Sequence, residues 1–128
     1  MLTAFNEAQF EPRLGYHVSV DTREPYMNES YRTFQEFYPF YLGEHANPVC
    51  RKLHFIGTSL VVVIVLWSMW SRDARWLLLA PVAGYGFAWA GHFFFEKNRP
   101  ATFTYPLYSL AGDWVMWKDI ITGKIRLS

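Results

Sequence analysis

Residues 44–57 read EHANPVCRKLHFIG, and this stretch decides how the chain is expected to fold. Asn47-Pro48 predicts the start of a helix, because Asn is a strong N-cap and Pro suits the first helical position, where its missing N–H has no intrahelical partner. The helix can then continue through the apolar run LVVVIVLW at residues 60–67. His45 and His54 lie where the polar sequence meets this apolar run, a position that the hydrophobic effect alone does not explain.

The apolar run predicts a membrane hairpin. A helix that is apolar on all sides is buried in a large protein or in lipid, and 128 residues are too few to surround it. After the polar turn SRDAR at 71–75, residues 76–96 supply a second, mainly apolar helix. Its length of about 20 residues is what a bilayer core requires. The sequence therefore predicts two membrane spans joined by a tight turn.

The segments that flank the hairpin are of three kinds. Residues 1–29 form a polar N-terminal arm. Residues 30–43 combine a capping box, Thr33-x-x-Glu36, with aromatic residues at helical spacing, which predicts an amphipathic helix. Residues 104–122 predict a fourth helix that is a third span, a re-entrant helix or an interfacial one. We expect an all-α integral membrane bundle with a two- or three-span hairpin core, in which residues 30–128 form a single helical membrane domain.

The charge pattern bears on partners and location. The net charge of +1 argues against a nucleic-acid partner, and the single Cys50 excludes an internal disulfide. Lys and Arg are more frequent at the histidine end of the hairpin than in its turn. The positive-inside rule therefore predicts that both termini and the histidine end are cytoplasmic, in a bacterial inner membrane or a eukaryotic endoplasmic reticulum.

A metal site is expected at the histidine end. His92 and Glu96 are four residues apart and share one helix face, and the hairpin returns them to the level of His45 and His54. Three imidazoles and a carboxylate are suitable ligands for a divalent transition metal, whereas a structural cysteine zinc site would need clustered thiolates. The alternative for the second pair alone is a helix-terminal His–Glu pair at the lipid headgroup level.

Two motifs resemble those of the 2-hydroxy fatty acid dioxygenase family. They are FYPFYLGEHANP at 37–48, followed by His54, and GHFFFEKNRPA at 91–101, and the resemblance covers roughly residues 31–119. It implies Fe(II)-dependent α-oxidation, in which a 2-hydroxy fatty acid and O2 give a fatty acid one carbon shorter. It also implies that the iron ligands are His45, His54, His92 and Glu96.

The resemblance suggests further roles around the iron. Arg51 or Arg99 would pair with the substrate carboxylate, since Arg is a good bidentate partner, with Lys97 as another candidate. Asn47 and Asn98 would orient ligands, and Asp113 would hydrogen-bond a ligating imidazole. Each has a simpler alternative: anchoring at the membrane surface for the cations, helix capping for Asn47, and a polar interfacial helix face for Asp113.

Two other functions are compatible with these residues. One is a small membrane scaffold or lipid-binding protein whose histidines only pair with headgroups. The other is a zinc- or copper-binding membrane enzyme with hydrolytic chemistry. Replacement of the histidines tests the first alternative, and metal analysis tests the second.

Overall fold

All regular structure in the computed structural model, which describes residues 30–128, is helical. This confirms the all-helical part of the prediction, while the predicted arm at 1–29 lies outside the described residues. The α-helices are α1 (Phe34–Gly43), α2 (Pro48–Ser71), α3 (Leu79–Ala90) and α4 (Pro106–Ile121). Shorter elements are the 3-10 helices η2 (Ala74–Leu78) and η4 (Ala101–Phe103) and the π-helix η3 (Gly91–Glu96).

The first two helices start where their capping residues predict. The Thr33 hydroxyl accepts the Glu36 N–H at 3.2 Å before α1. The Asn47 side chain accepts the Val49 N–H at 2.8 Å before α2, and Pro48 occupies the first turn. These bonds satisfy N–H groups that have no partner inside the helix. The two caps therefore fix where α1 and α2 begin.

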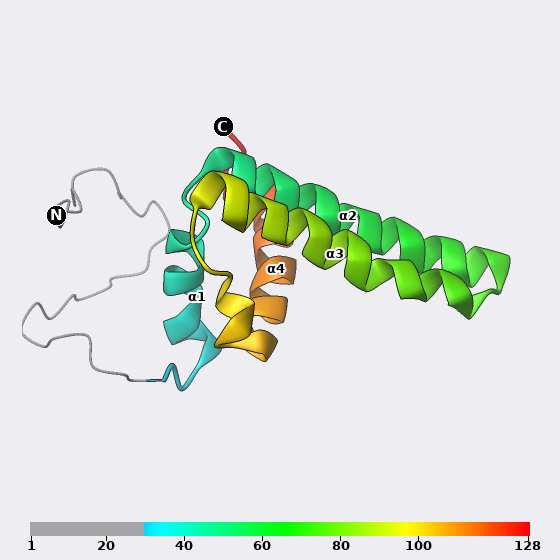
Figure 1. The fold of residues 1–128 in the computed structure, drawn as a ribbon, viewed down its shortest axis with the longest axis horizontal. Helices are drawn as coiled ribbons and strands as arrows, with labels where there is room; N and C mark the ends of the chain where they lie inside the picture. The colour runs from blue at the N-terminus through cyan, green and yellow to red at the C-terminus, as the bar shows by residue number, and fades with distance from the viewer. Residues whose placement is uncertain (1–29) are drawn as a thin grey trace, which may run out of the picture. The chain divides into compact units, whose positions relative to one another are not determined.

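Helices α2 and α3 run side by side as an antiparallel hairpin (Figure 1). Gly57 lets them approach closely, because a Cβ added there would lie 3.0 Å from the Phe87 Cβ and 3.1 Å from the Ala83 carbonyl oxygen. Small residues permit this kind of close packing between apolar helices. The turn of the hairpin ends α2 at Arg72, whose φ of 54° is left-handed.

The second helix of the hairpin is not uniform, although the sequence predicted one helix over 76–96. It begins as η2, continues as α3 and ends as the π-helix η3, which contains His92. At the start of η3, Gly91 packs directly on α2, since an added Cβ would lie 3.0 Å from the Cys50 Sγ. π-Helical turns are rare and are often found at functional sites.

Helices α1 and α4 pack together across one end of the hairpin (Figure 1). Their shared core is largely aromatic and consists of Phe37, Tyr38, Tyr41, Ala101 and Met116. Gly112 of α4 accommodates the Tyr41 ring, because an added Cβ would lie 2.9 Å from two of the ring carbons. The Trp117 indole N–H donates to the Ser59 hydroxyl at 3.0 Å and ties α4 to α2.

The surface of the hairpin is strongly apolar. Pro48–Ser71 and Ala74–Glu96 are each long and apolar enough to cross a membrane, yet only 22% and 17% of their most apolar stretches are buried. A core helix of a soluble protein would be mostly buried. The most exposed of the large apolar side chains on the hairpin include Val63, Leu66, Met69, Trp70, Leu78, Val82 and Phe94.

Candidate metal centre

His45 lies on the short loop between α1 and α2 and is 1% exposed. Its Nδ1 is 2.6 Å from the carbonyl oxygen of Tyr41. A carbonyl only accepts hydrogen bonds, so the Nδ1 of a neutral His45 carries the proton and its Nε2 presents a lone pair. The main chain thus selects the tautomer that can bind a metal through Nε2.

The second imidazole, His54 of α2, is oriented by a carboxylate. Its Nδ1 lies 3.2 Å from Asp113 Oδ1 of α4. The same carboxylate oxygen accepts the Tyr41 hydroxyl, so it is held in place from α1 as well. The contact expected between Asp113 and an imidazole is therefore present, and it favours a proton on the His54 Nδ1.

The third imidazole, His92 of η3, is oriented by an amide. Its Nδ1 lies 2.7 Å from Asn98 Oδ1. The Asn98 NH2 group donates to the Glu44 carbonyl oxygen at 3.1 Å and to the Glu44 carboxylate at 2.9 Å, which fixes the amide with its oxygen toward His92. Asn98 thus links the end of η3 to the loop that carries His45.

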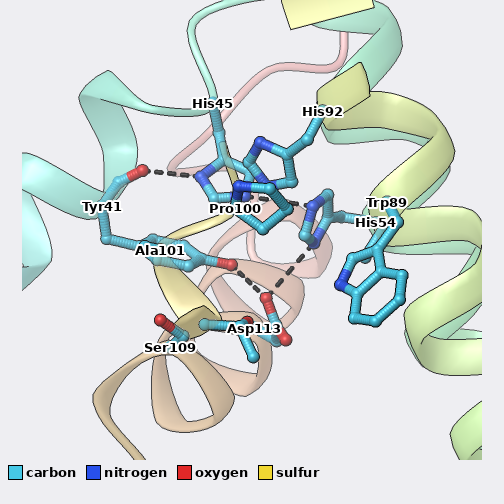
Figure 2. A pocket seen from close by; sticks show the side chains of 11 residues that line it. Tyr41, His45, His54, Trp89, His92, Pro100, Ala101, Ser109 and Asp113 are labelled. Atoms are coloured by element: carbon cyan, nitrogen blue, oxygen red, sulfur yellow. Dashed lines mark hydrogen bonds and ion pairs between the residues drawn. The ribbon is translucent and has the colours of Figure 1, made fainter. Parts of the chain in front are cut away.

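The three imidazoles converge on one point (Figure 2). Their ring centroids are 4.3, 4.5 and 5.0 Å apart, and the Nε2 atoms of His45 and His54 are separated by 3.1 Å. When His45 and His54 are both neutral with the proton on Nδ1, their two Nε2 lone pairs face each other in a buried space. A cation would convert this repulsion into coordination, and imidazole nitrogens suit a transition metal.

The electrostatics favour the metal-binding form of the site. Burial lowers the pKa of His45 well below its ordinary value of 6.5, and the neighbouring His54 and His92 lower it further. Burial, followed by the Asp113 carboxylate, raises the pKa of Tyr41 well above 10.0. Near neutral pH, His45 is therefore uncharged and Tyr41 is a hydroxyl donor, as the hydrogen bonds require.

Cys50 joins the cluster, although the sequence analysis used it only to exclude a disulfide. Its Sγ and one ligand atom from each of His45, His54 and His92 all lie within 4.8 Å of one another, and all four side chains are buried. The sequence does contain an indication that Cys50 lies near His54. Cys50 is four residues before His54, so the two side chains share one face of the helix.

Glu96 is not brought into this group. One carboxylate oxygen accepts the Ala46 N–H at 2.9 Å, and the other accepts the Asn47 N–H at 2.7 Å. In this structure Glu96 fastens the end of η3 to the loop that carries His45. A role for Glu96 as a metal ligand stays a prediction.

The other residues predicted at the site lie around its edge. Arg51 Nη1 donates to the carbonyl oxygens of His45 and Ala46 at 3.0 and 2.8 Å. Asn47 caps α2, and its NH2 group donates to the Phe95 carbonyl oxygen at 3.3 Å. The Arg99 guanidinium lies 5.1 Å from the Phe103 ring centroid. Both Asn47 and Arg51 therefore hold the loop that carries His45.

A small pocket opens beside the imidazoles. Its polar lining includes Tyr41, Asp113, Thr102 and Ser109 in addition to the histidines, and its apolar lining consists of Ala88, Trp89, Pro100 and Ala101. Its volume is about 10 Å³, enough for one ion or water molecule. Figure 2 shows Ser109 and Asp113 on the same helix below the imidazoles. A larger ligand requires the lining side chains to move apart.

Comparison with known proteins identifies the family. No curated protein and no solved structure matches the chain. The family described as "2-hydroxy-palmitic acid dioxygenase Mpo1-like" matches residues 31–125, which is more than half of the chain and includes the whole imidazole cluster. The chain therefore belongs to the Mpo1-like family.

Proposed function

We propose that this protein is a membrane-embedded, Fe(II)-dependent dioxygenase that converts a 2-hydroxy fatty acid and O2 to a fatty acid one carbon shorter. The observation that carries the proposal is the convergence of three buried imidazoles whose Nδ1 atoms each have an acceptor. The family description supports a 2-hydroxy acid as the substrate class. The exposed apolar hairpin supports a lipid-soluble substrate.

His45, His54 and His92 would hold the metal through Nε2. The acceptors on Nδ1 keep the rings oriented and increase their basicity, which is the usual arrangement around a ligating histidine. An Fe(II) held by these three imidazoles would supply open positions for a 2-hydroxy carboxylate and for O2. The chain's part is to keep this cluster rigid, neutral and largely closed to water.

The overall reaction balances without a second reductant. The bond between the carboxyl carbon and the α-carbon breaks, the carboxyl carbon leaves as CO2, and the α-carbon becomes the new carboxyl group. The acid gives up four electrons, and O2 accepts them to supply one oxygen of the new carboxyl group and one water. The substrate therefore serves as its own electron donor.

The membrane places the site and the substrate together. The apolar pocket wall of Trp89, Pro100 and Ala101 adjoins the histidines, and the exposed faces of α2 and α3 extend away from it. An acyl chain could lie along these faces in lipid while its polar head reaches the cluster. The charges of Arg51, Lys52, Lys97 and Arg99 support a cytoplasmic location for this end.

Anaerobic reconstitution with Fe(II), followed by oxygen uptake with 2-hydroxypalmitate, tests the proposal. We expect oxygen consumption with release of pentadecanoate, detected by mass spectrometry, and no consumption with palmitate. The variant His92→Ala should lose this activity. The matched control is His17→Ala, because His17 belongs to the polar segment before residue 30. Wild-type protein that holds iron but leaves 2-hydroxypalmitate unchanged would refute the proposed reaction.

Cys50 favours one alternative, a zinc enzyme or a structural zinc site. Three imidazoles and a thiolate would complete the four-coordinate set that zinc prefers in closed sites. Metal analysis of the protein purified from membranes distinguishes the two functions. Zinc in the wild type, together with zinc loss in Cys50→Ser, would favour the alternative, whereas the dioxygenase predicts iron that is retained in Cys50→Ser.

A further inference from the structure

The hydroxyl of Ser109 is buried without a hydrogen-bond partner. Ser109 is 2% exposed, and its Oγ bonds to no other atom in the described part of the chain. Helical serines commonly bond to the carbonyl oxygen four residues earlier. Here the Tyr105 carbonyl oxygen accepts the Ser109 backbone N–H at 2.8 Å, and the hydroxyl makes no such bond. Buried polar groups are nearly always paired, so this hydroxyl needs an explanation.

The position of Ser109 in the pocket offers an explanation for its unpaired hydroxyl. It precedes Asp113 by four residues on α4, so both side chains are on one face of the helix, and both line the pocket beside the imidazoles (Figure 2). Asp113 is already engaged by Tyr41 and His54. The Ser109 hydroxyl is therefore a free donor in the lining of the pocket.

The arginines expected to meet the substrate do not line this pocket. Arg51 Nη1 is used by two backbone carbonyls, and the Arg99 guanidinium lies over the Phe103 ring. Polar contacts to a ligand in the pocket must therefore come from its lining. A serine hydroxyl can rotate to donate to a carboxylate or hydroxyl oxygen.

We infer that Ser109 is a substrate-binding residue whose hydroxyl donates a hydrogen bond to an oxygen of the 2-hydroxy carboxylate head. This inference rests on the proposed function. It gives the buried hydroxyl its partner and helps to orient the acid beside His45, His54 and His92.

Binding to the zinc-loaded protein in detergent tests the inference, because zinc undergoes no redox change. Isothermal titration with 2-hydroxyoctanoate compares the wild type with Ser109→Ala and Ser109→Thr. We expect Ser109→Ala to weaken binding about tenfold, as the loss of one such hydrogen bond does, and Ser109→Thr to restore most of it. Titration with octanoate identifies the oxygen: equal losses for both acids indicate the carboxylate, and a loss for the 2-hydroxy acid alone indicates the hydroxyl group.

The control is Ser68→Ala, which removes another buried serine hydroxyl near the hairpin turn, where it donates to the Asp73 carbonyl oxygen at 3.0 Å. It should leave acid binding unchanged. Zinc content should be the same in all variants, so that a change in acid binding does not reflect a change in metal loading.

Three results would overturn the inference: equal acid binding by wild type and Ser109→Ala, a lower zinc content of Ser109→Ala, or no acid binding by the wild type. Equal acid binding by wild type and Ser109→Ala, together with oxygen uptake by the iron-loaded wild type, refutes the role of Ser109 but not the proposed function. Tight acid binding that depends on Ser109, without oxygen uptake, refutes the dioxygenase and retains the binding role.

Discussion

At the scale of single residues, the site depends on the choice of imidazole tautomer. Each Nδ1 has a different acceptor: the Tyr41 carbonyl, the Asp113 carboxylate or the Asn98 amide. All three acceptors favour the neutral tautomer that carries its proton on Nδ1, which is the form that can bind a metal through Nε2. These three partners are therefore expected to matter for metal affinity almost as much as the histidines.

Asp113→Asn tests the carboxylate among these acceptors. The substitution keeps the size of the side chain but removes the charge that faces His54 and Tyr41, and we expect metal affinity to fall about tenfold to a hundredfold. The measurement is competition with a chromogenic chelator. Asp119→Asn makes the same change on the same helix, where the carboxylate accepts the Tyr38 hydroxyl at 2.9 Å and contacts none of the histidines in residues 30–128. Equal losses in both variants would contradict the assigned role.

The buried His45 predicts a pH dependence of the metal-free protein. Its pKa in the folded state lies below 6.5, because of burial first and its neighbouring histidines second. Below pH 6.5 the unfolded chain binds a proton there and the folded chain does not, so stability is present above this pH and is lost as pH falls. The loss for this residue is at most about 1.4 kcal/mol per pH unit. Thermal unfolding with a chelator between pH 7.5 and 5 measures it, and His45→Gln should flatten the slope.

Glu96→Gln separates a bracing role from ligation. The carboxylate accepts two backbone N–H groups of the loop, and its loss of charge should lower the free energy of unfolding by about 1–2 kcal/mol. Metal stoichiometry should stay at the wild-type value. Denaturation and metal analysis on the same preparation measure both quantities. Unchanged stability with lost metal would instead make Glu96 a ligand, as the sequence analysis expected.

At the scale of helices, the sequence carries most of the local information. The start of α2 was predictable because Asn47-Pro48 provides its own capping chemistry, independent of the rest of the chain. The α2–α3 hairpin was predictable because a polar turn divides two apolar runs. The return of His92 to the level of His54 then follows from helix lengths alone, which is why the three histidines could be grouped in advance.

What could not be predicted depends on contacts between distant segments. The acceptor of His45 is a backbone carbonyl, which has no sequence signature. The π-helix at Gly91–Glu96 has no local signal either and accompanies the tight packing of Gly91 on Cys50. The bonds from Glu96 to the loop also required a tertiary structure, since His-x-x-x-Glu on a helix equally suits metal ligation.

Gly112→Ala tests how closely α4 must approach α1. An added Cβ would lie 2.9 Å from the Tyr41 ring, so the ring or the helix must shift, at a cost of about 1–3 kcal/mol. Tyr41 also contacts His45 and Asp113, so metal affinity should fall too. Gly86→Ala is the matched control, because its Cβ meets nothing within 4 Å and should be neutral or slightly stabilising. Thermal unfolding and chelator competition measure both effects; two variants of equal stability would contradict the packing argument.

At the scale of the whole helical domain, the candidate site lies at one end of a long apolar hairpin. Helix α4 has 16 residues, so it is about 24 Å long, shorter than the 30 Å of a bilayer core. It crosses the end of the hairpin instead of extending along it (Figure 1), and it carries the buried Asp119. For the membrane-embedded protein that we propose, these features favour two spans over three and predict that α1 and α4 lie at the membrane surface.

Two spans make a definite topological prediction. The hairpin turn should face one side of the membrane, while the loop before α2 and the C-terminal residues face the other. Single cysteines at Glu44, Arg72 and Lys124, in a Cys50→Ser background that has no other thiol, report this in sealed vesicles treated with an impermeant maleimide. Glu44→Cys and Lys124→Cys should label from the same side and Arg72→Cys from the opposite side, because α4 returns the chain without crossing the bilayer. Labelling of Lys124→Cys from the same side as Arg72→Cys would mean that α4 is a third span. Labelling of all three cysteines from one and the same side of intact vesicles would mean that the hairpin does not cross the membrane.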